Sequence, residues 1–393
     1  MKHRTRTLLV TALVTVLASA ASADIDVMLQ NQYLGTDLTP VIISPPELVG
    51  ERVVEALENV AASLPAERLE RLARMIADRA PHAVVLNEAF AFSCTDLPGT
   101  PANQGCGNQR ISGAFVDFLA HTESNLGGAY VTKARVRNFN LDGLPFEIDG
   151  YIAFLGVEDR DAILVRSDVA PASAPVPLEL SGCRVSLEGC NYLAVPTIDT
   201  ALGPITIERG YVAVDMFVDG DPYRVFGTHL EVRQIVPGPA GEPTRVFQRL
   251  QAGELANVAL SFPAAPGTRT LVIGDINSAP TDEFDLVDSP FGPLPPPYVL
   301  FSGQGFTDVW TLQSGVATGR GAPLVGNTCC QDEDLANRRS LLTRRIDIIF
   351  SLEKPARVRD ARVLGDGVAD KTWPPGLGLW PSDHASVAAR LAY

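Results

Sequence analysis

The sequence predicts an α+β fold in which two packed, mainly antiparallel β-sheets carry helices on their outer faces. Short apolar runs typical of strands occur along the whole chain of 393 residues, whereas few segments show the apolar spacing of amphipathic helices. Such a mixture favours two sheets packed face to face, because each sheet must bury one face. No low-complexity linker or internal repeat divides the chain, so we expect residues 24–393 to form a single domain.

The first 23 residues have the pattern of a secretory signal peptide. A basic segment, Met1–Arg6, precedes the apolar run Thr7–Leu17, and the small residues Ala21–Ala23 supply a cleavage site. This run is too short for a membrane anchor, and no other run is long and apolar enough to span a bilayer. The sequence therefore predicts a secreted or periplasmic protein without stable membrane insertion, and we expect a monomer.

The expected mature chain is strongly acidic. The full sequence has a formal net charge of −14. Without residues 1–23, which hold three basic and no acidic residues, 29 basic and 46 acidic residues remain, giving −17. Such a surface repels phosphate backbones unless a metal ion or a basic patch intervenes. The charge argues weakly against a non-specific nucleic-acid binder, since a divalent metal changes the local sign.

The first half of the chain alternates predicted strands and helices. Pro near the start and apolar three- and four-residue spacings predict two consecutive helices. A Cys-, Gly- and Pro-containing loop is expected at 91–110. The predicted helices are Pro46–Ser63, Pro65–Arg79 and Ala114–Thr122, and the predicted strands are Ile25–Asn31, Ala83–Glu88, Tyr130–Val136, Phe146–Leu155 and Asp161–Arg166.

The second half begins with a Cys loop at 170–200 and contains one clear hairpin. Its turn is expected at Asp219-Gly220-Asp221, between strands Gly210–Val218 and Tyr223–Thr228. An amphipathic helix follows, and residues 286–304 form a Pro-rich excursion. The last strand is expected at the edge or end of a sheet. The predicted helix is Thr244–Leu260, and the further strands enter the stretch 271–280 and cover Arg344–Phe350 and Ala385–Leu391.

Six cysteines lie in the mature part, and their spacing favours two local disulfides. Cys94–Cys106 and Cys183–Cys190 would each close a short Gly-containing loop, while Cys329 and Cys330 would form a vicinal pair or stay free thiols. Export makes disulfides plausible. A zinc site is the rival interpretation, but no CxxC motif and no neighbouring His supports it.

Polar side chains gather where several apolar strands end. Asp275 and Asn277 follow a buried run and project from the same face, two residues apart, which suits the orientation of a water or a phosphate. They could also simply cap the turn. Glu88 closes another apolar run, where it could be merely solvated. His229 follows Thr228 at a third strand end, where a lone His is also compatible with a core or surface role.

Two further strands carry acids and a second imidazole. Asp347 lies inside an apolar run, where an unpaired buried carboxylate is costly and should have a partner. Asp383 and His384 head the final strand. Two imidazoles with carboxylates and carboxamides suit metal-assisted attack of water on phosphorus, and Glu and Asp without Cys fit a hard, oxygen-ligated cation.

These motifs, in this order, resemble the endonuclease/exonuclease/phosphatase superfamily over most of the mature chain. The resemblance implies a four-layer α/β/β/α sandwich. Asn87 departs from the pattern, because a Gln usually precedes the Glu. The resemblance assigns no position to the Tyr or Arg that several nucleases of the family use on the substrate. The matching segments are Leu29-Gln-Asn31-Gln-Tyr-Leu-Gly35, Val84-Val-Leu-Asn-Glu88, Gly227-Thr-His229-Leu, Gly274-Asp275-Ile-Asn277, Arg345-Ile-Asp347 and Ser382-Asp383-His384.

The resemblance implies a role for each matching residue in a Mg²⁺-dependent phosphoric ester hydrolase, with Mn²⁺ or Ca²⁺ as alternatives. The metal would lie at Asn31, Glu88 and Asp383. Asp275 and Asn277 would orient the attacking water. His229, and His384 held by Asp347, would contact the phosphoryl group.

The substrate class stays open at this level, because the fold and site are shared by enzymes with different substrates. A phosphodiester of a lipid headgroup, a nucleotide, or DNA or RNA would fit, and the acidic surface favours a small or lipid phosphodiester. The alternative is a catalytically inactive secreted binding module.

One loop, Asp366–Ser382, is expected to contact substrate. It carries Trp373 and Trp380 directly before Asp383. Aromatic rings on a Pro-stiffened loop suit the stacking of a base or contact with lipid, so we expect Trp380 to be partly exposed. The alternative is that both rings pack beneath the loop.

Overall fold

The computed structural model describes residues 24–200, 203–233, 242–282, 285–289, 292–313, 325–372, 374 and 378–393. The expected signal peptide, residues 1–23, and Trp373 lie outside the described residues.

Two large sheets form the centre of the molecule, as the sequence predicted. Pairs β1/β2 and β12/β13 are parallel, and every other pair described in these sheets is antiparallel. The first sheet has the order β16 (Arg357–Leu364), β17 (Ser386–Ala392), β1 (Ile25–Asn31), β2 (Ala83–Asn87), β5 (Tyr151–Arg166) and β3 (Ala91–Asp96), and β4 (Tyr130–Ile148) also pairs with β5. The second has the order β14 (Thr307–Asp308), β15 (Asp347–Ser351), β13 (Arg269–Asp275), β12 (Asp221–His229), β11 (Gly210–Val218), β8 (Gly189–Asn191) and β7 (Arg184–Ser186), with β6 (Ser173–Pro175) beside β11. A separate pair consists of β9 (Thr197–Thr200) and β10 (Gly203–Thr206).

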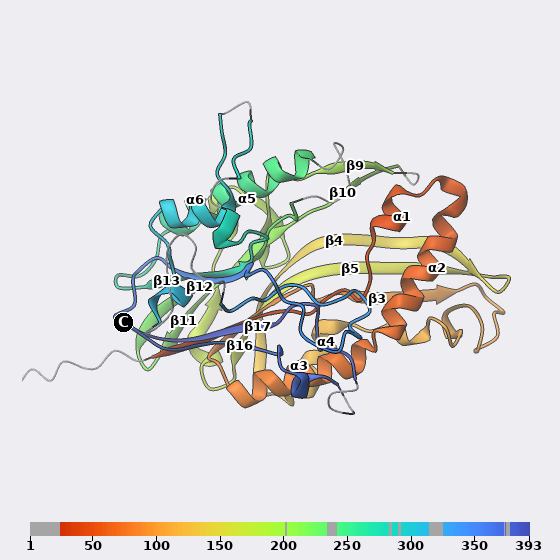
Figure 1. Ribbon diagram of the computed structural model, residues 1–393, viewed down its shortest axis with the longest axis horizontal. Coiled ribbons are helices and arrows are strands. Elements are labelled where there is room, and N and C mark those ends of the chain that lie inside the picture. The colour runs from red at the N-terminus through yellow and green to blue at the C-terminus, as the bar shows by residue number, and fades with distance from the viewer. Residues whose placement is uncertain are drawn as a thin grey trace, which may run out of the picture.

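Helices cover the outer faces of both sheets and complete the α/β/β/α arrangement (Figure 1). Side chains of α3 and α4 pack on the outer face of the first sheet, and side chains of α5 and α6 pack on the second. None of the helices in the described part of the chain is long and apolar enough to cross a membrane. The α-helices are α1 (Thr39–Ile43), α2 (Pro46–Ala62), α3 (Pro65–Arg79), α4 (Phe118–Leu126), α5 (Glu242–Ser261) and α6 (Pro297–Gly303). The short 3₁₀ helices are Gly105–Gly107, Ser112–Ala114, Ala170–Ala172, Leu178–Ser181, Pro280–Asp282, Val309–Leu312 and Val368–Asp370.

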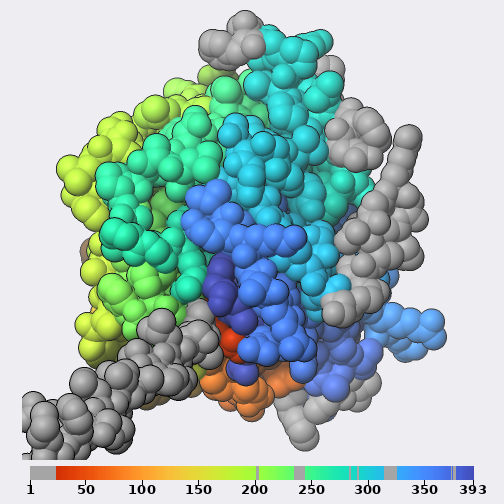
Figure 2. All heavy atoms as spheres, turned by 90° about the vertical axis from the view of Figure 1, so that its left-hand side faces the viewer, coloured from red at the N-terminus to blue at the C-terminus, as the bar shows by residue number. Residues whose placement is uncertain are grey.

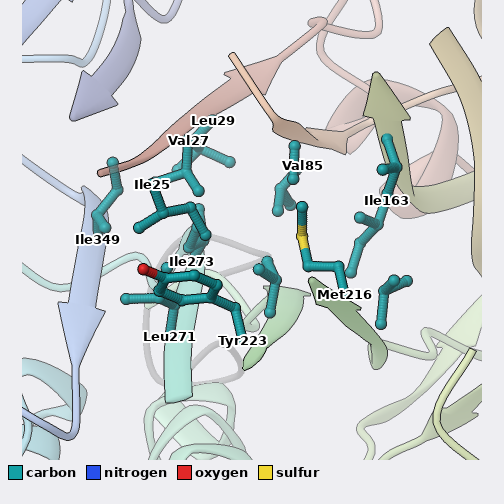
Figure 3. Close-up of a cluster of buried hydrophobic side chains, with 14 of the residues drawn as sticks. Ile25, Val27, Leu29, Val85, Ile163, Met216, Tyr223, Leu271, Ile273 and Ile349 are labelled. Carbon is teal, nitrogen blue, oxygen red and sulfur yellow. The ribbon is translucent and has the colours of Figure 1, made fainter. Parts of the chain in front are cut away.

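The main core lies between the two sheets. Alternate residues of each strand point inward, so Ile25, Val27 and Leu29 of β1 meet Leu271 and Ile273 of β13 (Figure 3). The sheets approach closely at Gly227, where an added Cβ would lie 3.0 Å from Val85 Cγ1 and 3.2 Å from Ile163 Cγ1. This close packing fixes the strand ends of one sheet relative to those of the other.

The ends of the chain meet in the first sheet. β1 pairs with β17, with Ile25 opposite Leu391. In Figure 2 the red atoms of the first described residues accordingly lie beside the dark blue atoms of the C-terminal end. The prediction that the last strand lies at the edge or end of a sheet was wrong, because β16 extends the sheet beyond β17.

Three other elements differ from the predictions. The expected strand Phe146–Leu155 is instead interrupted by a tight turn at Asp149 and Gly150, which joins β4 to β5, and both turn residues have positive φ angles, 51° and 84°. The expected loop at 91–110 begins with β3, which pairs with β5. Helix α4 begins later than predicted, because the Asp117 side chain caps it by accepting the Ala120 N–H.

The predicted disulfides are confirmed. Cys94–Cys106 and Cys183–Cys190 are bonded, with Cα atoms 5.7 and 5.8 Å apart, and Cys329 is bonded to Cys330. All six cysteines are therefore paired.

Candidate active site

The candidate site is the polar end of the core between the sheets. In β1, Asn31 continues the inward-facing series Ile25, Val27, Leu29, and in β13 Asp275 continues Leu271 and Ile273. The same alternation places His229 of β12 and Asp347 of β15 on the inward face. The alternation that builds the core therefore also directs these polar side chains into one space.

The carboxylate of Asp275 is the centre of this group. Its Oδ2 atom lies 3.4 Å from Asn31 Nδ2, 3.6 Å from His229 Nε2 and 3.8 Å from His384 Nε2. Strand register contributes, since His229 and Asp347 are both direct neighbours of Asp275 in the second sheet. The first sheet supplies Asn31 and, through the end of β17, His384.

Glu88 joins the group from the end of β2. Its Oε1 accepts the Asn31 Nδ2 group at 3.0 Å, and its Oε2 accepts the Leu34 N–H at 3.0 Å. The backbone of Glu88 is left-handed, with φ 54°, as are those of Tyr33 and Asn277, with φ 60° and 50°. Non-glycine residues in this region are uncommon and concentrate at functional sites, where the surrounding structure holds them.

Asn277 fixes the loop that follows β13. Its backbone N–H donates to Asp275 Oδ1 at 2.9 Å, and its Nδ2 donates to the Leu230 carbonyl at 3.0 Å. The same Nδ2 lies 3.3 Å from His229 Nε2. Asn277 therefore joins the Asp275 carboxylate to the end of β12, which carries His229.

His384 forms a buried ion pair with Asp347. Its Nδ1 lies 2.7 Å from Asp347 Oδ2. Burial opposes the charged imidazole, but the carboxylates of Asp347 and Asp383 outweigh it and raise the pKa of His384 well above its usual value. The Nε2–H of a charged His384 thus faces Asp275 and the centre of the site.

His229 has the opposite electrostatic environment. Burial, then the positive charges of Arg209 and His384, hold its pKa well below the usual value, so the ring is neutral at pH 7. Arg209 Nη1 can only donate and lies 3.1 Å from His229 Nδ1, whereas Asn277 Nδ2 lies farther, 3.3 Å, from Nε2. We therefore assign Nδ1 as the acceptor and place the ring proton on Nε2. Two imidazoles in one site therefore have different charges.

Arg209 is a site residue that the sequence analysis missed. It precedes β11, and its guanidinium also lies 3.7 Å from Asp159 and 3.6 Å from Glu231. The predicted hairpin could have indicated this contact. Its register pairs Tyr211 with Thr228 and therefore brings Arg209 beside the end of β12.

A buried network behind the site was missed as well. Asn87 Oδ1 accepts the backbone N–H of Asp275 at 3.1 Å, and its Nδ2 donates to Asp161 at 2.8 Å. Asn138 donates to the other oxygen of Asp161 at 2.9 Å. Asn87, which departs from the family pattern, thus links β2 to the strand carrying Asp275.

Buried Arg68 holds the two loops beside the metal-ligand candidates. It donates to the carbonyls of Gln32 and Tyr33, which follow Asn31, and of Pro381, which precedes Asp383. One side chain of α3 therefore ties together the ends of β1 and of the loop before β17.

Two carboxylates of the site, those of Asp275 and Asp383, resist ionisation. Burial, with the charge of Asp347, raises the pKa of Asp275 to about 7. Burial also raises the pKa of Asp383 to about 6, although the His384 charge acts in the opposite direction. A bound cation would offset this cost of burying charge.

The donor atoms fit a hard divalent cation. Glu88, Asp383 and Asp275 offer carboxylate oxygens, the preferred ligands of Mg²⁺ and Ca²⁺. Asp275, Asp347 and His384 also bring one ligand atom each within 4.8 Å of one another, and Asp347 Oδ1 is buried without a hydrogen-bond partner among the described residues. Asn31 orients its Nδ2 toward Glu88, and its Oδ1 accepts the Tyr33 N–H at 3.0 Å, so the Asn31 amide positions Glu88 in this arrangement.

The expectation that Trp380 is partly exposed was wrong. Its side chain is fully buried among Tyr33, Leu335 and Leu379, its Nε1 donates to the Asn337 carbonyl at 2.8 Å, and Lys371 Nζ lies 4.9 Å from the ring centre. The large apolar ring gains more from packing beneath the loop than it would from exposure. Trp380 therefore supports the loop before Asp383 instead of contacting substrate.

Solved structures with related folds have low sequence identity to this chain. No protein-family model matches the sequence, and neither does any curated protein. A Bacteroides thetaiotaomicron protein of the endonuclease/exonuclease/phosphatase family superposes with a TM-score of 0.50 at 14% identity, covering 95% of this chain and 99% of that one. Humanised D. rerio TDP2 gives 0.47 at 14% identity, covering 94% and 98%, and a Beutenbergia cavernae endonuclease/exonuclease/phosphatase gives 0.45 at 18%, covering 94% and 71%.

Proposed function

Because the chain has the fold of the endonuclease/exonuclease/phosphatase superfamily, whose members are generally metal-dependent phosphoesterases, we propose that it is a metal-dependent phosphoester hydrolase. A phosphodiester is the preferred substrate type, hydrolysed by in-line attack of water. The observation that carries this proposal is the convergence of Asn31, His229 and His384 on one oxygen of Asp275.

Asp275 is the residue best suited to activate water. Its Oδ1 is held by the Asn277 N–H, which leaves Oδ2 directed into the site. A carboxyl with a pKa of about 7 is a stronger base than an ordinary Asp and can take a proton from water near neutral pH. Asn277 keeps this carboxylate in position.

The two imidazoles are suited to the phosphoryl oxygens. Charged His384, held by Asp347 at 2.7 Å, donates an Nε2–H toward the negative charge that develops on phosphorus-bound oxygens. Neutral His229 donates its Nε2–H from the opposite sheet, since Arg209 occupies Nδ1. Asp347 acts through His384, by fixing its orientation and charge.

Glu88 and Asp383, with Asn31 beside them, are the residues that would hold a Mg²⁺ ion, or Mn²⁺ or Ca²⁺ in its place. When bound, such a cation stabilises negative charge on the phosphoryl oxygens. We also propose that the protein is exported after removal of residues 1–23, since its three disulfides fit an oxidising compartment.

Hydrolysis of bis(p-nitrophenyl) phosphate tests the proposal. We expect nitrophenol release with Mg²⁺, none with a chelator, and a loss of about 10²–10⁴-fold in Glu88→Gln. Glu67→Gln, an exposed glutamate of α3, is the matched control and should leave turnover unchanged. Equal, metal-independent rates in all three proteins would contradict the proposal, and binding of phosphoesters without turnover would instead identify a binding module.

A further inference from the structure

An apolar cavity of about 420 Å³ adjoins the candidate active site. Its walls come from the segment that includes α1, from α2, from β3, β4 and β5, and from the β9–β10 pair. Figure 1 shows these elements gathered on the side where β4 and β5 extend beyond the second sheet. The volume falls within the roughly 300–1,000 Å³ of small-molecule sites.

The cavity and the candidate active site share residues. Glu88 and Asp383, the metal-ligand candidates, line one end of the cavity together with Arg209, which contacts His229. A phosphoester bound at the site would therefore have one of its substituents directed toward this space.

Beyond this end, most of the lining residues are apolar. Val53 and Leu57 of α2 and Phe92 of β3 are buried in the surrounding core, so their positions are fixed by packing. Leu141 of β4 and Ile205 of β10 are only partly buried and complete the walls. A preformed apolar surface of this kind gains free energy when a ligand displaces water from it.

The charges around the cavity are unfavourable for a polyanion. Six carboxylates line it, and Arg209 is the one Lys or Arg among the described lining residues. Arg209 already lies within 4 Å of Asp159 and Glu231. A second phosphate in this space would meet net negative charge, whereas an uncharged tail would not.

We propose that the substrate is an amphiphilic phosphoester, with its single phosphoester at the candidate active site and an aliphatic tail in this cavity. The inference rests on the proposed function and names its substrate class. A tail gains affinity through each methylene that it buries, about fourfold per group.

Two adjacent isoleucines of α1 provide a matched pair of variants. Ile42 lines the cavity, whereas the side chain of Ile43 is 59% exposed and does not line it. No residue of α1 is fully buried, so Asn at either position should leave the protein folded. Ile42→Asn places a polar group on the proposed tail site, and Ile43→Asn makes the same chemical change outside it.

The test uses p-nitrophenyl alkyl phosphodiesters from ethyl to octyl with Mg²⁺, below their micellar concentrations. We expect kcat/KM of the wild type to rise at least 100-fold from ethyl to octyl. Ile42→Asn should lower kcat/KM for the octyl ester about tenfold or more without changing that for the ethyl ester, and Ile43→Asn should change neither. Hydrolysis of dihexanoyl phosphatidylcholine in solution would show that the substrate can be a dissolved amphiphile. Hydrolysis of phosphatidylcholine only in vesicles would show that the substrate is a lipid in a membrane.

A kcat/KM independent of chain length, or an equal effect of both variants on both esters, would overturn the inference, as would faster cleavage of plasmid DNA than of the octyl ester. If no diester is hydrolysed, the proposed function fails, and calorimetric titration then tests the cavity alone. The inference of an amphiphilic ligand would be supported if octylphosphonate binds more tightly than ethylphosphonate. Ile42→Asn should then weaken octylphosphonate binding, and Ile43→Asn should not. Equal binding of the two phosphonates would overturn the inference.

Discussion

The two ends of the interior between the sheets have opposite compositions although the same strands build both. Leu271 and Ile273 of β13 pack in the apolar end (Figure 3), and Asp275 of the same face lies in the polar end. From Leu271 to Asp275 is about 13 Å along a strand. At the first end, burial of each side chain stabilises the protein. At the second, burial of the Asp275 carboxylate costs free energy and raises its pKa.

This difference shows how the apolar end supports the polar one. Asp275, Asp347 and His384 are buried within a few ångströms of one another. Removing these ionisable groups from water costs free energy and, taken alone, would favour a structure in which they are exposed. The interdigitated sheets hold the strand ends in place, so that these groups keep their positions despite that cost. Variants at the polar end should therefore mainly lower kcat/KM, and variants at the apolar end should mainly lower the free energy of unfolding.

The largest effect is expected at the polar end, on activity. His229→Ala should lower kcat/KM on bis(p-nitrophenyl) phosphate by about 10²–10⁴-fold, or roughly 3–5 kcal/mol, because it removes a donor to the phosphoryl group. Some stability should also be lost because the ring is buried, so kcat/KM is measured at a temperature at which both proteins are fully folded. His121→Ala on α4, whose ring contacts only the Ala66 carbonyl among described hydrogen bonds, is the control. Steady-state kinetics with wild-type turnover in His229→Ala would remove His229 from the mechanism.

The apolar end should respond in stability instead. Ile273→Ala, two residues before Asp275, should lower the free energy of unfolding by about 2–5 kcal/mol through lost burial and a residual cavity. Urea denaturation measures this change, and activity of the remaining folded protein should stay within a few-fold of the wild type. A large loss of activity at unchanged stability would mean that the two ends are not separable in this way.

Asp275→Asn should raise stability while abolishing activity. The pKa of Asp275 is about 7 in the folded protein against about 3.9 in an unfolded chain, so between these pH values the folded state holds a proton that the unfolded state releases. The free energy of unfolding of the chelated wild type therefore falls as pH rises through this window. Asn lacks this titration and should be more stable at pH 8 by about 1–3 kcal/mol. Melting curves from pH 4 to 8 in chelator measure it, and parallel profiles for both proteins would refute the assignment.

The smallest effect is expected at Trp380. Phe in its place keeps most of the buried ring but loses the hydrogen bond to the Asn337 carbonyl, at a cost of about 1 kcal/mol. Activity on short and long phosphodiesters should fall equally or not at all, because the described hydrophobic cluster that contains the ring shares only Tyr33 with the cavity lining. A loss of activity on long-chain substrates alone would show that this loop does contribute to substrate selection.

The sequence by itself determined the strands, their polar ends and the two local disulfides. Apolar alternation is a local property, so it located β1, β2, β12 and β13 and showed which residues end them, including Asn31 and Asp275. The Asp-Gly turn at 149–150 was also readable, and missing it split one long hairpin into shorter pieces.

Only the tertiary structure decided which polar groups meet and which aromatic ring is buried. Arg209 reaches His229 through the pairing of β11 and β12, Asn87 reaches Asp275 across the two sheets, and Trp380 packs on residues far away in sequence. The cavity depends on at least five elements whose contacts no local pattern encodes. Alternation fixes the face on which a side chain lies, but its partners depend on how sheets pack, and packing is a property of the whole chain.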